Sequence, residues 1–297
     1  MTGPAPTGPP HTPAGPARGL TGPAAAPPER PRVYSSPLPT PRPHLGHALA
    51  SEWTKLVSVR STLWTLGSLV VTVVGVGLLF IVKTVDQDYV DMPFTAPALF
   101  GLLVGQLAVM LLGVLTITSE HGTGLIRTTF TASPTRYRVL TAKYLVFGVT
   151  ALLTTAGSVF VVGLAAQIVH SGPVAGPHPD SDWLGALAGC VYVTLLGVLA
   201  LAVGSLVRHS AGAVAVMLGL VTLPPVIGGM LIAWEAAASV GETTLRYNAP
   251  VALMQLFGLS DTSGAQLPGG FAQMALILLV TGAAVAASYV VVGRQDT

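Results

Sequence analysis

The sequence predicts an all-α polytopic membrane protein with six transmembrane helices, an N-terminal amphipathic elbow helix and both termini in the cytoplasm. Charged residues make up 9% of the 297 residues and hydrophobic residues 51%, and the mean hydropathy is +0.69. A soluble domain carries about 25% charge. The apolar residues also form long unbroken runs, which argues against the alternating pattern of a membrane β-barrel. Cys190 has no partner in this chain, so a disulfide scaffold is excluded.

Residues 1–43 form the first predicted segment, a disordered, Pro-rich cytoplasmic tail. They hold 14 of the 24 prolines, and such a composition does not bury enough apolar area to offset the entropy of ordering. P-x-x-P spacings occur in the tail, but this composition produces them by chance. A signal peptide is disfavoured, because the first apolar run begins near residue 61 and is longer than a signal core.

The pattern of residues 44–60 predicts an interfacial amphipathic helix. At 100° per residue, Leu45, Leu49, Trp53 and Leu56 share one stripe, and polar side chains occupy the other side. This pattern is typical of a helix that lies in the headgroup layer with its tryptophan at the boundary. The alternative is that the segment extends the first transmembrane helix inwards. The residues expected to define this elbow are Glu52, Trp53, Lys55 and Arg60.

Residues 61–297 are expected to form the six-helix transmembrane domain. A spanning helix needs about 20 apolar residues, and only helices satisfy their own backbone hydrogen bonds in hydrocarbon. Long stretches free of Asp, Glu, Lys and Arg meet this requirement. The spans are expected near residues 61–82, 97–118, 144–168, 184–207, 211–234 and 271–293.

The basic residues predict the orientation of these spans. Of the 14 Lys and Arg residues, all but Lys83 and Arg246 fall in segments on the same side as the N-terminus. Lys and Arg are enriched in cytoplasmic loops. Both termini are therefore expected in the cytoplasm of a multi-pass protein of the cell (plasma) membrane. The net charge of +2 is too small and too scattered to indicate nucleic-acid binding.

The loop between the second and third spans, residues 119–143, is the longest predicted cytoplasmic connection. It contains two glycines, Gly122 and Gly124, then a short amphipathic stretch, a turn at Pro134 and a second basic stretch. These features favour a surface helix that docks on a cytoplasmic partner. The alternative is that its four basic residues serve only to hold the loop inside.

Two segments then resemble a known family. Residues 51–62 (SEWTKLVSVRST) are followed by a span and by residues 119–128 (SEHGTGLIRT), and this order is similar to that of the permease subunits of ABC-2-type ABC transporters. The similarity covers about residues 45–297. The second segment resembles the family pattern E-x-G-T/S-G-T-I-R, with Leu125 where threonine is common and His121 where tyrosine or phenylalanine is common.

The resemblance implies a membrane-spanning subunit of an ATP-driven transporter, an exporter by expectation. In that family a coupling helix between spans two and three rests on a separate ATP-binding subunit, and two permease copies, or a copy and a paralogue, enclose the path. Carried onto this chain, the coupling segment is residues 119–129, and short re-entrant helices fall in residues 241–270, around the apolar section 249–259. The expected contacts are Glu120, His121, Gly122, Thr123, Gly124, Leu125, Ile126 and Arg127.

The chain itself is not expected to be an enzyme. A P-loop needs a Gly-Lys pair, and no lysine follows a glycine here. The sequence also lacks an H-E-x-x-H zinc helix and a G-x-S-x-G nucleophile turn. No cofactor or metal is therefore expected on this chain, and ATP with Mg²⁺ is expected on the partner subunit.

Polar residues within the spans are few. No ionisable residue lies in the middle of a span, which disfavours an ion-coupled carrier. Gln106 and Gln167 are candidates for a translocation path, with interhelical hydrogen bonding as the alternative for both. Pro224 and Pro225 predict a kink or break in the fifth span. A non-transporting membrane anchor or regulatory subunit on the same scaffold remains the alternative function.

Overall fold

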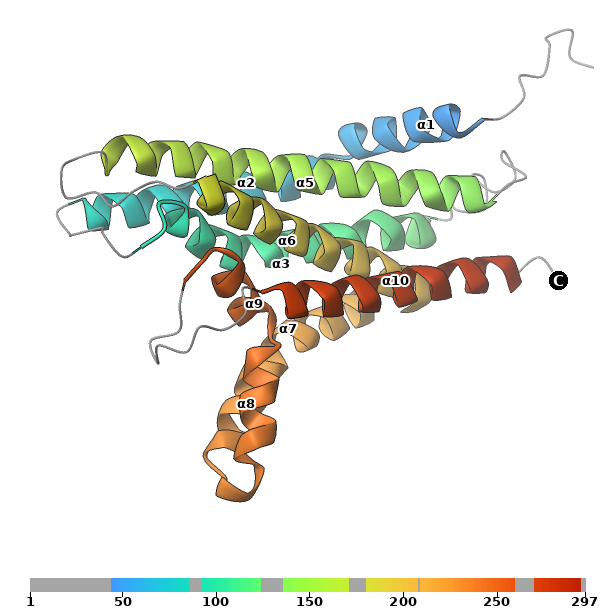
Figure 1. Cartoon of the computed structure of the whole chain (residues 1–297). Coiled ribbons are helices and arrows are strands. Elements are labelled where there is room, and N and C mark those ends of the chain that lie inside the picture. The colour runs from blue at the N-terminus through green and yellow to red at the C-terminus, as the bar shows by residue number, and fades with distance from the viewer. Residues whose placement is uncertain are drawn as a thin grey trace, which may run out of the picture. The chain divides into compact units, whose positions relative to one another are not determined.

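The computed structural model divides the chain into two units, Met1–Arg42 and Pro43–Thr297. The structure describes residues 44–85, 92–123, 136–170, 180–207, 209–259 and 270–294, all in the second unit. The predicted disorder of residues 1–43 therefore lies outside the described residues. Within the described ranges every regular element is a helix, and the long helices run side by side (Figure 1).

Six helices are long and apolar enough to cross a membrane, as predicted. Their mean hydropathy follows from uninterrupted runs of Leu, Val, Ala and Gly, which in hydrocarbon are stable only as helix. They are α2 (Arg60–Thr84), α3 (Ala96–Thr123), α5 (Arg136–Val169), α6 (Asp180–Val207), α7 (Ser210–Ile232) and α10 (Phe271–Arg294).

Helix α5 begins eight residues before residue 144, where the third span is expected to start. The prediction treated the basic residues before the apolar run as loop. In the structure the first turns of α5 pack on the end of α10: the Thr141 hydroxyl lies 2.7 Å from that of Tyr289, and the Tyr144 hydroxyl lies 2.9 Å from that of Ser288. These contacts extend the helix past the apolar segment.

Helix α1 (Leu45–Ser58) is separate from α2, because Val59 between them is extended, with φ −82° and ψ 114°. The chain therefore does not continue as one long helix into the first span. Only Glu52 and Leu56 of α1 are buried, whereas Trp53 is exposed. The sequence pattern had grouped Glu52 with the polar side of the helix, whereas the structure buries Glu52 together with Leu56.

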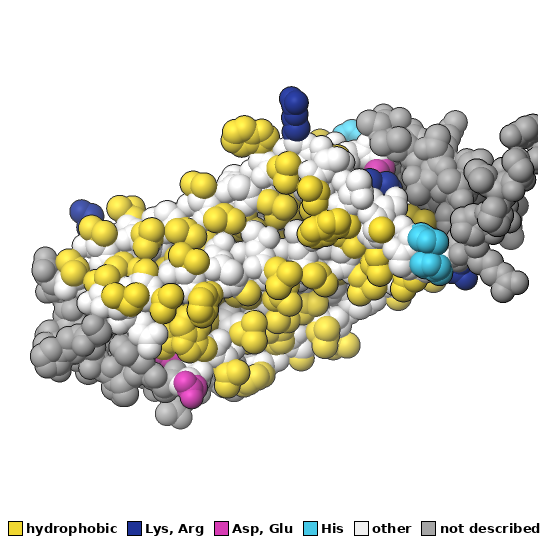
Figure 2. All heavy atoms as spheres, turned by 90° about the horizontal axis from the view of Figure 1, so that it is seen from above, with side chains coloured by type: hydrophobic (Ala, Val, Ile, Leu, Met, Phe, Trp, Pro, Cys, Tyr) yellow, Lys and Arg dark blue, Asp and Glu magenta, His cyan; other side chains and the backbone are white. Residues whose placement is uncertain are grey.

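The core of the bundle is the crossing of α3 and α6, the two most buried spans. Their backbones approach closely at Gly113, where a Cβ would meet the carbonyl oxygen of Gly197. Helices α2, α7 and α10 are mostly exposed along their apolar lengths. Figure 2 shows hydrophobic side chains along most of one face, with the visible acidic side chains towards its two ends. That distribution is expected where lipid, rather than water, covers the surface.

Three short elements precede α10. The 3₁₀ turn η1 (Glu235–Ala237) and α8 (Ala238–Arg246) fold back on the end of α7, and α9 (Ala249–Leu256) packs against α6 (Figure 1). Asn248 caps α9 by accepting a hydrogen bond from the Val251 amide at 2.8 Å. Helix α7 continues through Pro224 and Pro225. The sequence predicted either a kink or a break at these prolines, and the break does not occur.

Candidate functional site

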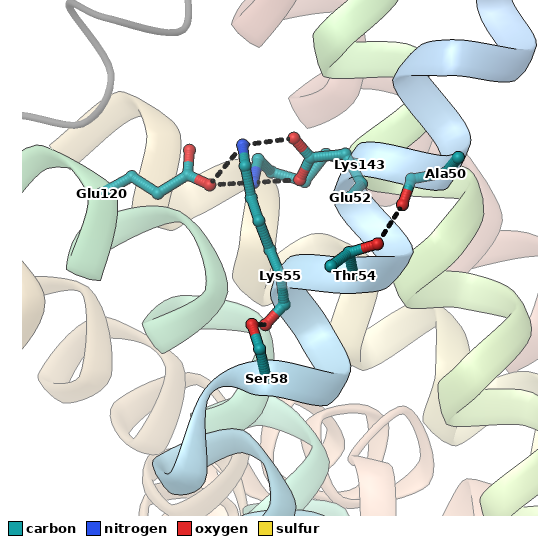
Figure 3. A network of polar contacts seen from close by, with 7 residues as sticks. All are labelled: Ala50, Glu52, Thr54, Lys55, Ser58, Glu120 and Lys143. Atoms are coloured by element: carbon teal, nitrogen blue, oxygen red, sulfur yellow. Dashed lines mark hydrogen bonds and ion pairs between the residues drawn. The ribbon is translucent and has the colours of Figure 1, made fainter.

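Four charged side chains meet where α1 packs against the spans. Glu52 and Lys55 come from α1, Glu120 from the last part of α3 and Lys143 from the first part of α5 (Figure 3). We call these four residues the charge cluster. They are 91 residues apart along the chain at most, so tertiary packing brings the three helices' contributions together.

Lys143 is the centre of the charge cluster. Its ammonium donates to Glu52 Oε2 at 2.6 Å and to Glu120 Oε1 at 2.7 Å. Lys55 repeats the pattern, donating to Glu52 Oε1 at 2.7 Å and to Glu120 Oε1 at 3.2 Å. Each lysine thus bridges both carboxylates, so α1 is ion-paired to α3 through Lys55 and to α5 through Glu52.

Burial makes these ion pairs strong. The Lys143 side chain is 4% exposed and the Glu52 side chain 5% exposed, so the pair is poorly screened by solvent. Such a pair is stable only when each charge is matched and hydrogen-bonded, and two ammonium groups here face two carboxylates. Burial by itself disfavours the charged form of Lys55, but the hydrogen bond that Lys55 donates to Glu52 and the negative charges of Glu120 and Glu52 outweigh it. The pKa of Lys55 is therefore raised.

Local sequence positions the α1 half of the charge cluster. Glu52 and Leu56 are one turn apart, so the same face of α1 presents a carboxylate and an apolar side chain to the bundle. Lys55 follows Glu52 by three residues and lies beside it. The end of α1 is closed by the Ser58 hydroxyl, which donates to the Lys55 carbonyl at 3.2 Å, and by the Val59 amide, which donates to the same oxygen.

The structure brings together three residues that the sequence had assigned to two different segments. Glu52 and Lys55 belong to the predicted elbow, and Glu120 is an expected contact of the coupling segment. Trp53 and Arg60, the other elbow residues, are exposed. His121, Gly122 and Thr123 continue α3, and their side chains are outside the description; Gly124, Leu125, Ile126 and Arg127 lie outside the described residues.

Lys143 was missed as a site residue. From its sequence position Lys143 is expected among the basic residues that hold the loop inside, whereas the structure buries it within α5. A signal was available: Lys143 stands directly before an apolar run, where a charge is costly unless it is paired. Its partners, however, lie 91 and 23 residues earlier, and no local pattern identifies them.

The two glutamines proposed for a translocation path lie far from the charge cluster. Gln106 and Glu120 lie on the same helix, α3, but are separated by about 21 Å along it, at about 1.5 Å per residue. On α5, Gln167 lies about 36 Å further along the helix than Lys143. Gln106 is 2% exposed, and its Nε2 donates to the Leu103 carbonyl at 2.9 Å. Its Oε1 has no hydrogen-bond partner among the described residues. Gln167 is half-buried.

An apolar cavity of about 200 Å³ lies between α3 and α7, one turn beyond Gln106. Leu107, Leu111, Met217 and Leu218 are among the side chains that line it. Gln106 itself is not part of the lining of this cavity.

Other reactive side chains in the described part of the chain lie apart from the charge cluster. Cys190 is free and buried, and no group of three His, Cys, Asp or Glu residues there could hold a metal ion. His170, at the end of α5, is buried and lies 3.4 Å from the Thr84 hydroxyl on α2. The charge cluster is therefore the main polar feature of the described bundle.

Comparison with known proteins adds no further assignment. A scan against models of protein families and a search of curated proteins each found no match. The geometry of the charge cluster and the order of the sequence segments are therefore the grounds for the function considered next.

Proposed function

We propose that this chain is the transmembrane permease subunit of an ATP-driven ABC transporter of the ABC-2 type, and that it exports its substrate. A separate ATP-binding subunit, carrying ATP and Mg²⁺, supplies the energy, and a second permease copy or a paralogue completes the path. The proposal is supported by six helices of spanning length and by the resemblance of segments 51–62 and 119–128 to that family.

One observation carries the proposal. Glu120, at the start of the expected coupling segment, pairs with Lys55 of α1 and with Lys143 of α5. A coupling segment must transmit force, and a segment tied only to its own helix would bend. Here its first residues are connected to three helices at once, which is the arrangement that a force-transmitting junction requires.

The charge cluster is suited to transmission because it resists separation. Removing one partner from a buried ion pair costs about 3–5 kcal/mol, so moderate displacement of residue 120 moves α1 and the start of α5 with it. Long helices carry that motion along the bundle, since α3 and α5 run through most of its length. The proposed consequence is that docking at residues 119–129 tilts α3, α5 and α1 together.

The remaining parts of the proposal concern orientation. We place α1 in the headgroup layer as an elbow helix, with exposed Trp53 towards lipid, and we place both termini in the cytoplasm of the plasma membrane. The hydroxyl contact between Tyr144 and Ser288 lies near the start of α5 and the end of α10. The end of α10 is thus at the same end of the bundle as the charge cluster.

The test is co-expression with the proteins that the adjacent genes encode, followed by detergent purification and measurement of ATP hydrolysis. The proposal predicts that an ATP-binding protein among them co-purifies with this chain. It predicts further that Gly124→Pro and Arg127→Glu lower permease-dependent ATP hydrolysis without lowering the amount of membrane-inserted protein. Arg246→Glu, the same charge reversal on exposed α8, is the matched control and should leave hydrolysis unchanged.

Two results would contradict the proposal. One is the absence of any ATP-binding protein in the purified sample. The other is ATP hydrolysis that is unaffected by Gly124→Pro and Arg127→Glu in a complex that still forms. Either result would favour a membrane anchor that recruits a cytoplasmic protein but does no transport.

A further inference from the structure

A second cavity lies beside the charge cluster. Its volume is about 210 Å³, and it is enclosed by α1, the Val59 linker, α2, α3 and α5. This cavity therefore lies at the end of the bundle where α1 meets the spans, and it is distinct from the cavity between α3 and α7. Its lining includes Leu56, Val59 and Val146 as apolar side chains and Thr62, Thr116 and Ser119 as hydroxyl side chains.

The charged residues in the lining do not indicate an ionic ligand. Glu52, Lys55, Glu120 and Lys143 all border this cavity, but the two ammonium groups and two carboxylates pair with one another. Thr116 also donates its hydroxyl to its own helix, at the Leu112 carbonyl, 2.7 Å away. The rest of the wall consists largely of apolar atoms. This largely apolar wall favours an apolar occupant.

The cavity borders the surface that lipid would cover. Val59 lines the cavity and is itself 43% exposed. One turn further along the chain, Leu63 and Trp64 of α2 are also exposed, Trp64 to 80%. A helix of spanning length with such exposed apolar residues is surrounded by hydrocarbon. The apolar surface of α2 therefore continues into the cavity at Val59.

We propose that the cavity holds an acyl chain of a phospholipid from the surrounding bilayer. The chain enters past Val59 and lies against Leu56 and Val146, while the headgroup stays at the surface near Lys55, whose side chain is 33% exposed. Lys55 has a third N–H beyond its two carboxylate bonds, which can donate to the lipid phosphate. The lipid would thus fill the space between α1 and the spans. This inference does not depend on the ATP-binding subunit.

The test uses bilayer vesicles of phosphatidylcholine that carries a photoreactive diazirine in one acyl chain. The full-length wild-type protein is reconstituted and irradiated, and the adducts are located by peptide mass spectrometry. We expect adducts at Leu56 or Val146, in addition to those on the exposed lipid-facing helices. Because this measurement uses the unmodified chain, it does not depend on any variant folding.

A variant then separates the cavity from the general lipid surface. Val146→Phe fills the cavity and should abolish the adduct at Leu56. Val71→Phe, the same substitution at an exposed position of α2, is the matched control and should leave that adduct unchanged. The thermal melting of both variants checks that the fold is retained.

Three outcomes would overturn the proposal. The first is wild-type protein with adducts only on exposed residues and none at Leu56 or Val146. The second is an adduct at Leu56 that persists in folded Val146→Phe protein. The third is a bound molecule other than phospholipid, found by native mass spectrometry of protein extracted from cells, that competes with the photoreactive lipid and so assigns the cavity to itself.

Discussion

Lys143→Met gives the sharpest test of the charge cluster. The substitution removes an ammonium that is 4% exposed and keeps a side chain of similar length. It also removes two ion pairs, of 2.6 and 2.7 Å, to Glu52 and Glu120. Two buried carboxylates are then left with Lys55 alone, so the cluster changes from neutral to one negative charge.

The expected cost is about 3–5 kcal/mol in the free energy of unfolding, the range for breaking a buried ion pair by removing one partner. Lys55→Met should cost less, because Lys55 is one-third exposed and water can replace part of its interaction. The double variant with Lys143→Met and Glu52→Gln should lower the free energy of unfolding by about 0.5–3 kcal/mol less than the sum of the two single effects. Unfolding is followed in mixed micelles by tryptophan fluorescence, since Trp53 and Trp64 flank the α1–α2 junction.

The matched control is Lys83→Met, at an exposed lysine near the end of α2. Surface substitutions of this kind usually change stability by no more than about 0.5 kcal/mol. The reasoning is refuted if Lys143→Met and Lys83→Met have the same small effect, or if the double variant is simply additive.

Four further predictions follow from the packing and the charges. Gly101→Val should lower the free energy of unfolding by about 1–3 kcal/mol, because a Cβ at Gly101 meets the backbone of Val73 on α2. Gly157→Val should be tolerated, because there is open space around Gly157, and equal melting temperatures of the two variants would contradict this prediction. Gln106→Met should leave stability within about 1 kcal/mol, since the amide bonds only within its own helix; if transport falls while melting is unchanged, Gln106 acts on the path. The pKa of Lys55 is raised above its ordinary 10.5, so the stability that Lys55 contributes is complete below pH 10.5 and is lost only as the pH rises through the raised pKa. Limited proteolysis should therefore show α1 in place near neutral pH, and loss of α1 contacts there would contradict this prediction. In a Cys190→Ala background, a cysteine at residue 127 should react with an impermeant reagent only after permeabilisation, and one at Ser239 should react in intact cells; the reverse pattern would invert the proposed orientation.

The six spans could be predicted because each is a property of one local stretch. Twenty apolar residues without a charge identify a helix whatever its neighbours are, and the observed helices α2, α3, α6, α7 and α10 begin within about four residues of the predicted spans. The start of α5 was missed because it is stabilised from outside the stretch. Tyr289 and Ser288 of α10 hold its first turns, nearly 150 residues further along the chain.

The charge cluster could be predicted only in part, for the same reason. Hydrophobic periodicity placed Trp53 on the apolar stripe of α1, at the membrane boundary, and Glu52 on the polar side, because it scores a carboxylate as a residue that avoids burial. Burial of Glu52 is favourable only when Lys143 is at 2.6 Å. The two residues are 91 positions apart, and their contact depends on how α1 packs against α5. The family resemblance marked Glu52, Lys55 and Glu120, but as parts of two separate segments.

The most direct measurement of the central proposal is photo-crosslinking from the coupling segment in living cells. A photoreactive amino acid is placed at Leu125, and at Ser239 on α8 as the control. The account predicts that irradiation joins residue 125 to a protein with a Gly-Lys-Ser/Thr nucleotide-binding loop, and that residue 239 gives no such product. An adduct to that protein from residue 239 but not from residue 125 would contradict the account, as would the absence of any ATP-binding protein among the products.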